Sequence, residues 1–106
     1  MLFLYKYKDE VCTEIRVDYD KETVEAKNLT ESNLKKAFGV NEYPSFGDWE
    51  ALLEERCFDR NADGRKLRLR ELGLDYYDPY EIVLKTEGRL EGDFFSLVKV
   101  GRYGFI

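Results

Sequence analysis

The fold class follows from the stretch Val11-Cys12-Thr13-Glu14-Ile15-Arg16-Val17-Asp18-Tyr19. Its odd positions are apolar except for Thr13, and its even positions carry Cys12 and three charged side chains. Such period-two alternation, with one polar side, is typical of an antiparallel strand that buries one face. The stretch is therefore predicted to be a half-buried strand with Cys12 on its outer face.

Two more strands are predicted beside this one. Residues 2–7 form a β-rich run with an aromatic side chain at every odd position, and residues 23–29 form a weaker run with Val24 and Ala26 on its inner side. Short polar breaks at residues 8–10 and 20–22 separate the three runs. Strands joined by short polar turns predict a three-stranded antiparallel meander.

Helical spacing begins in the middle of the chain. Leu34, Ala37 and Phe38 lie at i, i+3 and i+4, and Gly39 suits the residue after a helix end. Ser45 and Asp48 have the spacing of a capping box. The helix predicted after this box has one apolar stripe, made of Trp49, Leu52, Leu53 and Cys57.

Two further helices and a last strand are predicted in the second half. Residues 65–72 favour a helix because they are rich in strong helix formers and precede Gly73, although Leu67 and Leu69 also alternate as in a strand. Asp78 and Pro79 predict the N-cap and first position of another helix, which Gly88 ends. Residues 94–100 are predicted to be a returning strand, and residues 101–106 an aromatic tail.

The length of 106 residues and the order of these elements predict one domain over residues 1–106. Segregated strands and helices indicate the α+β class and not a parallel α/β fold. The expected architecture is an N-terminal three-stranded antiparallel meander, three to four short helices and one C-terminal returning strand.

The composition excludes several classes of protein. The chain has no histidine, which rules out a Ser-His-Asp triad, a Cys-His pair and a histidine-ligated zinc or haem. Its two cysteines, Cys12 and Cys57, are too few for a four-cysteine zinc site. The sequence also lacks a Gly-rich phosphate loop and favours no pair of carboxylates for acid–base work. We therefore expect a protein that is not an enzyme and takes no cofactor.

The net charge of −5, from 17 basic and 22 acidic residues, argues against direct binding to nucleic acid or to an anionic membrane. No run approaches the roughly 20 apolar residues of a membrane span. Residues 1–8 lack the features of a cleavable signal peptide. These observations predict a cytoplasmic protein with reduced thiols.

Basic residues are concentrated in one segment. Residues 59–74 carry five basic and three acidic residues, a net charge of +2, although the whole chain is acidic. The segment could contact a protein partner, or it could be a solvated helix face paired with Glu54, Glu55 and Glu71.

Aromatic residues crowd the last third of the chain, and adjacent pairs cannot both point inward, so the outward members could extend a contact surface. That aromatic group comprises Tyr76, Tyr77, Tyr80, Phe94, Phe95, Tyr103 and Phe105. The predicted partner-binding residues are Arg56, Arg60, Arg65, Arg68, Tyr76, Tyr77 and Phe95.

An acidic ridge is predicted along the meander, from Glu14, Asp18, Asp20, Glu22 and Glu25. Carboxylates at alternate strand positions could occupy a basic groove that normally holds nucleic acid. The alternative is that these carboxylates only keep the protein soluble.

The turn at Asp59, Asn61 and Asp63 reproduces the opening of a calcium-binding loop, D-x-N-x-D-G. The twelfth position of such a loop should supply a bidentate carboxylate, but here it is Arg70. Nearby basic residues would also repel a divalent cation. A polar connection between two helices is therefore favoured over a metal site.

The second half resembles a known family. The stretches W-E-A-L-L-E-E-R-C-F-D-R, L-R-E-L-G-L, K-T-E-G-R and G-D-F-F-S-L-V are similar to the N-terminal module found with HipA-type kinase toxins and their relatives on mobile elements of Gram-positive bacteria. The matching positions are Trp49, Arg56, Arg60, Leu72, Gly73, Gly88, Asp93 and Phe95. Phe58 and Asp59 stand where a proline is expected. The resemblance implies a module that acts by binding, because it lies outside the phosphotransfer site, and a free-standing copy is similar to an antitoxin subunit.

Two functions are consistent with these features. The first is a small non-enzymatic regulatory protein of a mobile element, which restrains a kinase-like toxin through the basic turn and the aromatic residues. The alternative is an acidic inhibitor of a nucleic-acid-guided nuclease, of the anti-CRISPR type, which acts by charge mimicry.

Overall fold

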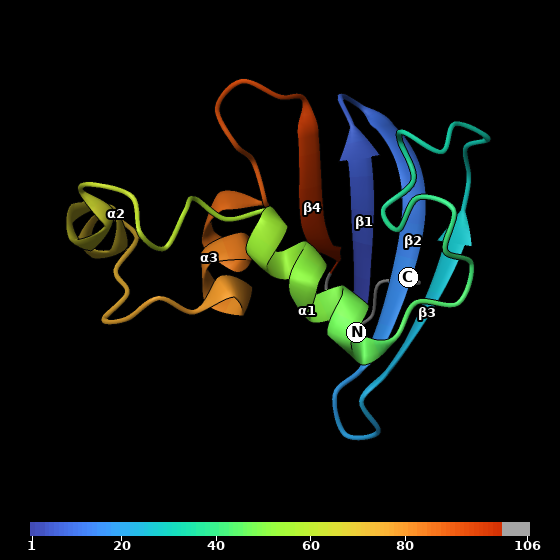
Figure 1. Ribbon diagram of the computed structural model, residues 1–106, viewed down its shortest axis with the longest axis horizontal. Helices are drawn as coiled ribbons and strands as arrows, with labels where there is room; N and C mark the ends of the chain where they lie inside the picture. The colour runs from blue at the N-terminus through green and yellow to red at the C-terminus, as the bar shows by residue number, and fades with distance from the viewer. Residues whose placement is uncertain (101–106) are drawn as a thin grey trace.

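Four antiparallel strands form one sheet in the computed structural model, which describes residues 1–100 (Figure 1). The strands are β1 (Leu2–Tyr7), β2 (Glu10–Asp18), β3 (Thr23–Asn28) and β4 (Phe95–Val100), in the spatial order β3-β2-β1-β4. The helices are α1 (Phe46–Glu55), α2 (Arg65–Glu71) and α3 (Pro79–Thr86). The predicted α+β class, the meander and the returning strand are thus confirmed, whereas the predicted aromatic tail, with Tyr103 and Phe105, lies outside the described residues.

The alternation in β2 is interrupted by a bulge. Ile15 and Val17 are buried, as predicted, and Ile15 lies opposite Phe3 of β1. The register then shifts, so that Tyr5 pairs with Thr13 but Lys6 pairs with Val11. Cys12 is the extra residue of this shift, and it is fully buried. The prediction that Cys12 faces outward was therefore wrong, because strict alternation takes no account of a β-bulge.

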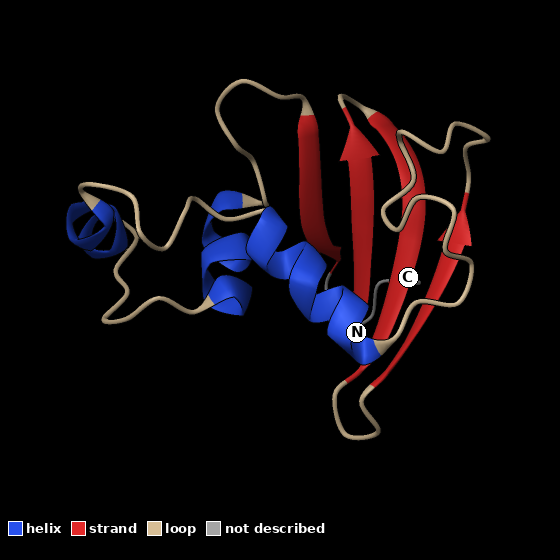
Figure 2. Cartoon of the chain, viewed as in Figure 1, coloured by secondary structure: helices blue, strands red, loops and turns tan. Residues whose placement is uncertain are grey.

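Helix α1 lies across the sheet and supplies much of the core (Figure 2). It begins as predicted with a capping box, in which the Ser45 hydroxyl accepts the Asp48 amide and the Asp48 carboxylate accepts the Ser45 amide. The hydrogen bond from the Ser45 amide lowers the pKa of Asp48. Trp49, Leu52 and Leu53 are buried from this helix, and the Trp49 ring lies 4.6 Å from that of Phe3.

The helix predicted around residues 34–39 does not form. Residues 33–40 fold as successive turns instead, and Leu34 is 91% exposed. A helix this short must recover the cost of its nucleation by burying an apolar face. With Leu34 outside the core that face is missing, and the segment is instead anchored by the Ala37 amide, which donates to the Thr13 hydroxyl.

Helix α3 and the turn after it hold β4 in place. The Asp78 carboxylate caps α3 by accepting the Tyr80 amide, and Pro79 is the first helical residue, as predicted. The helix ends in a left-handed turn at Glu87 and Gly88, with φ angles of 57° and 63°. A Cβ atom at Gly88 would lie 2.8 Å from Leu97 Cβ, so glycine is required here by both conformation and space.

Helix α2 lies away from the sheet and from the other two helices. It lies at the end of the molecule farthest from β3 (Figure 1), and none of its Cα atoms is within 8 Å of a Cα atom in another helix or strand. Its single buried residue is Leu69. None of the helices in residues 1–100 is long and apolar enough to cross a lipid bilayer.

Candidate functional site

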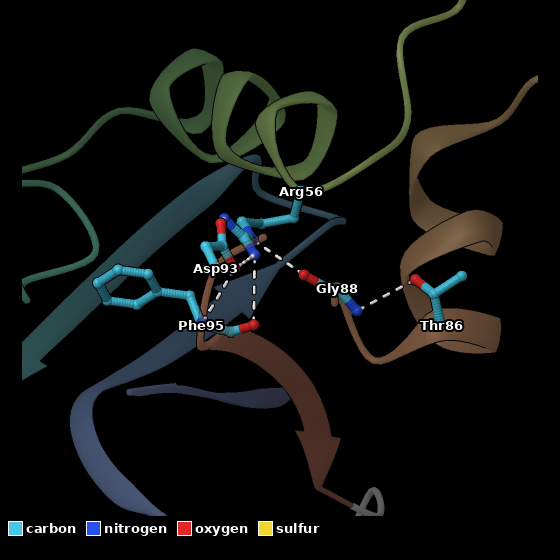
Figure 3. Close-up of polar contacts among 5 residues, drawn as sticks. All are labelled: Arg56, Thr86, Gly88, Asp93 and Phe95. Carbon is cyan, nitrogen blue, oxygen red and sulfur yellow. Dashed lines mark hydrogen bonds and ion pairs between the residues drawn. The ribbon is translucent and has the colours of Figure 1, made fainter. Parts of the chain in front are cut away.

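Arg56, which was predicted to contact a partner, is an interior residue. Only 4% of it is exposed, and its guanidinium donates to both carboxylate oxygens of Asp93, at 3.0 and 2.9 Å (Figure 3). It also donates to the backbone oxygens of Gly88, at 2.9 Å, and Phe95, at 3.2 Å. The hydrogen bonds of Arg56 are therefore made within the chain, and Arg56 does not belong to the surface that was predicted to bind a partner.

The Arg56 network joins the end of α1 to the connection between α3 and β4. Asp93 accepts the Phe95 amide in addition to Arg56, and the Gly88 amide donates to the Thr86 hydroxyl (Figure 3). Phe95 is half-buried and stacks on the ring of Tyr5, at 5.2 Å. Phe95, which was also predicted to bind a partner, therefore packs mainly against the interior.

The ion pair with Arg56 predicts how stability depends on pH. Hydrogen bonds from Arg56 lower the pKa of Asp93. A depressed folded-state pKa contributes stability above the unfolded value, about 3.9, and this contribution is lost as the pH falls through the folded pKa. We expect Asp93→Asn to lower the free energy of unfolding by about 1–2 kcal/mol at neutral pH. The difference from the wild type should shrink as the pH falls below about 4, measured by urea denaturation across pH.

Asp63→Asn is the matched control for this experiment, because Asp63 is exposed and forms no ion pair within residues 1–100. It should leave the free energy of unfolding nearly unchanged at every pH. A wild-type advantage over Asp93→Asn that stayed constant down to strongly acidic pH would contradict the role given to this ion pair.

The segment 59–74, which we call the basic lobe, contains α2 and five basic residues. Arg60 donates to the Glu54 carboxylate at 2.7 Å and lies over the Tyr77 ring, and Arg68 lies over the Phe58 ring. Arg65, Lys66 and Arg70 are exposed, and none has a carboxylate within 4 Å among the described residues. Of the pairings expected for a solvated helix face, only Arg60 with Glu54 is formed.

Exposed apolar side chains accompany these charges. Leu67 is 58% exposed and Tyr76 is 69% exposed. Tyr77 is held more tightly: its ring packs edge-on against Phe58, its hydroxyl donates to the Phe58 carbonyl, and burial raises its pKa to about 12. Leu67 was not among the predicted site residues. The sequence does indicate that Leu67 is exposed, because on a helix in this segment it lies on the side opposite Leu69 and Leu72.

The predicted acidic ridge is interrupted by basic residues. Across β2 and β3, Glu14 is paired with Lys27 and Glu25 with Arg16. Asp18 ends β2, where its carboxylate accepts the amides of Asp20 and Lys21, and Glu22 lies in the same turn. The five carboxylates therefore do not form one continuous negative strip.

The turn that resembles a calcium loop is stabilised by a hydrogen bond between its own residues. The Asp59 carboxylate accepts the Asn61 amide at 2.8 Å, which is the hydrogen bond of an Asx-turn. Asp63 follows in the same turn, before α2. Within residues 1–100, no three acidic or cysteine side chains gather as a metal ion would require.

The two thiols are buried and poorly suited to nucleophilic attack. Burial raises the pKa of Cys57 to about 12 and raises that of Cys12 as well. The thiolate is the reactive form of cysteine. At neutral pH both residues are therefore protonated side chains of the core.

The structure thus separates the predicted contact residues into two groups. Arg56 and Phe95 lie in the interior network, whereas Arg60, Arg65, Arg68, Tyr76 and Tyr77 lie on or beside the basic lobe. Arg56, Gly88, Asp93 and Phe95, which carry part of the family resemblance, are brought together in the interior network. Comparisons of the chain with protein-family models, with curated proteins and with solved structures found no match.

Proposed function

We propose that this chain is a small non-enzymatic binding protein that restrains a protein partner through the basic lobe. One observation carries the proposal. Helix α2 lies away from the sheet and presents Arg65, Lys66 and Arg70 without carboxylate partners among residues 1–100, on the same helix as the exposed Leu67. The exposed Tyr76 follows in the connection to α3.

The chemistry of the lobe indicates the chemistry of the partner. Arginine and tyrosine are the residues that most often contribute strongly to binding at protein interfaces. Unpaired cations around an exposed leucine fit an acidic surface with an apolar centre. By the family resemblance, the partner would be a kinase-like toxin encoded on the same mobile element, and the chain would act as its antitoxin.

Charge mimicry of nucleic acid is less well supported. That mechanism needs a continuous row of negative charge, but Arg16 and Lys27 lie opposite Glu25 and Glu14 on the sheet. On α2, by contrast, Arg65, Lys66 and Arg70 form no ion pair within residues 1–100.

The proposal predicts that reversing the charge of α2 abolishes restraint. We expect the double variant Arg65→Glu/Arg70→Glu to lose neutralisation when it is co-expressed with a kinase-like protein encoded beside it, because like charges would then face each other. Growth of the host cells measures neutralisation, and titration calorimetry on the purified pair measures affinity. Affinity should fall by at least about a hundredfold, which corresponds to about 2.8 kcal/mol.

The matched control is Arg16→Glu/Lys27→Glu, which makes the same change in charge on the sheet. It should leave neutralisation intact. If the sheet variant lost binding and the α2 variant kept it, the basic lobe would not be the contact surface. Capture of a basic nuclease that tolerated both changes would favour the inhibitor of a nucleic-acid-guided nuclease instead.

A further inference from the structure

A hollow of about 300 Å³ lies between the second half of α1 and the first turn of α3, and we call it the acidic groove. Its apolar walls include Tyr19, Leu53 and Tyr80, and its carboxylates are Glu50, Glu54 and Asp78. Among residues 1–100, no basic side chain lines it. The groove therefore combines an apolar floor with a negative rim.

One side of the groove is held by contacts between aromatic side chains, and the other side carries a carboxylate that forms no ion pair within residues 1–100. The Tyr19 hydroxyl accepts the Trp49 indole N–H at 2.9 Å, and the Tyr19 ring packs edge-on against Tyr80, at 5.7 Å. Glu50 is exposed and forms no ion pair within residues 1–100. Glu54 already binds a guanidinium, that of Arg60 from the basic lobe of the same chain. One carboxylate of the groove thus already forms an ion pair with an arginine of the basic lobe.

The outer face of α2 has the complementary pattern. Because Leu69 points inward, helix geometry places Leu67 on the opposite side of α2. Lys66 and Arg70, four residues apart, form a row along one edge of Leu67, and Glu71 lies along the other edge. The leucine and the row of two cations beside it match an apolar floor that has the carboxylate of Glu50 on its rim. Within one chain this face does not occupy the groove, because no Cα atom of α2 lies within 8 Å of one in α1 or α3.

We infer that α2 of one copy docks in the acidic groove of a second copy. Leu67 covers the apolar floor, and Lys66 and Arg70 pair with Glu50 and its neighbours. The contact joins two different surfaces, so the association is head-to-tail. In such a pair one copy keeps a free groove and the other keeps a free α2, and further copies can add at either end. Self-association goes beyond the proposed function, and it occupies the α2 face that the partner would need, so the two events compete.

Sedimentation velocity over a range of protein concentrations tests the inference. The weight-average mass of the wild type should rise above the 12.6 kDa of one chain as concentration increases. It should fall back near 1 M salt, where the Debye length is only about 3 Å. Glu50→Arg, which disables the groove, and Lys66→Gln/Leu67→Gln/Arg70→Gln, which disables α2, should each weaken self-association by about tenfold or more.

Mixing the two variants is the decisive step. Each retains the surface that the other lacks, so an equimolar mixture should form a dimer with twice the mass of one chain and nothing larger. Glu91→Arg is the matched control, because it makes the same change in charge at an exposed residue outside the groove, and it should associate like the wild type.

Several outcomes would overturn the inference. These are a wild type that stays monomeric at every concentration, a mixture of the two variants that stays monomeric, and a control variant that associates as weakly as Glu50→Arg. The proposed function is tested separately, because Glu50→Arg keeps the basic lobe intact. This variant should still neutralise the partner, whether or not self-association is found.

Discussion

Arg56→Ala should lower the free energy of unfolding by about 2–4 kcal/mol, because a side chain that is only 4% exposed loses both its packing and its charge-assisted hydrogen bonds, whereas Asp93, 36% exposed, stays partly solvated. The substitution would leave the Asp93 carboxylate and the Gly88 and Phe95 carbonyls without the donor that now satisfies them. The free energy of unfolding of a native protein is about 5–15 kcal/mol, so this loss would be a large part of the total. Urea denaturation followed by circular dichroism would measure the loss.

Arg60→Ala is the control for this variant. Arg60 also forms an ion pair with a carboxylate, at 2.7 Å, but its side chain is 50% exposed and that of Glu54 is 54% exposed. Exposed pairs contribute about 0–1 kcal/mol. Arg56→Lys should recover only part of the loss, because an ammonium cannot form the two parallel hydrogen bonds of a guanidinium. Equal and small losses for Arg56→Ala and Arg60→Ala would show that the network around Asp93 does not stabilise the fold.

The contrast between these two arginines shows where prediction from sequence stops. The two residues are only four positions apart in the sequence, and both were predicted to contact a partner. Arg56 pairs with Asp93, which lies 37 residues further along the chain, beyond helices α2 and α3. Such a pairing depends on tertiary packing, and no local spacing encodes it. Capping boxes and strand alternation, by contrast, act within a few residues, which is why Ser45, Asp48 and Ile15 were placed correctly.

Register explains the other departures. Glu14 and Glu25 were grouped by their positions along the strands, but the pairing of β2 with β3 sets Lys27 and Arg16 opposite them. A shift of one residue between β1 and β2 likewise turned Cys12 inward. The basic lobe was predicted from composition alone, whereas the exposure of Leu67 depends on which side of α2 carries the buried Leu69. Charge content can thus be predicted from the sequence, but the faces that carry it depend on the fold.

Trp49→Ala should also destabilise the chain by about 3–5 kcal/mol, the usual cost of truncating a buried aromatic residue. Trp49 is fully buried from α1, against the ring of Phe3. Its loss would leave a cavity where the helix meets the sheet. It would also remove the indole donor that holds Tyr19 at the edge of the acidic groove. Circular dichroism should report the unfolding midpoint, since the chain has a single tryptophan and the variant has no indole fluorescence.

Two substitutions separate the packing of Trp49 from its hydrogen bond. Trp49→Phe keeps most of the apolar volume but removes the N–H donor, and Tyr19→Phe keeps the donor but removes its acceptor. Each should cost about 1–3 kcal/mol, less than Trp49→Ala, and Tyr19→Phe tests the penalty for a buried donor without a partner. If Trp49→Ala and Trp49→Phe unfolded at the same urea concentration, the packing of the indole against Phe3 would not be what holds α1 on the sheet.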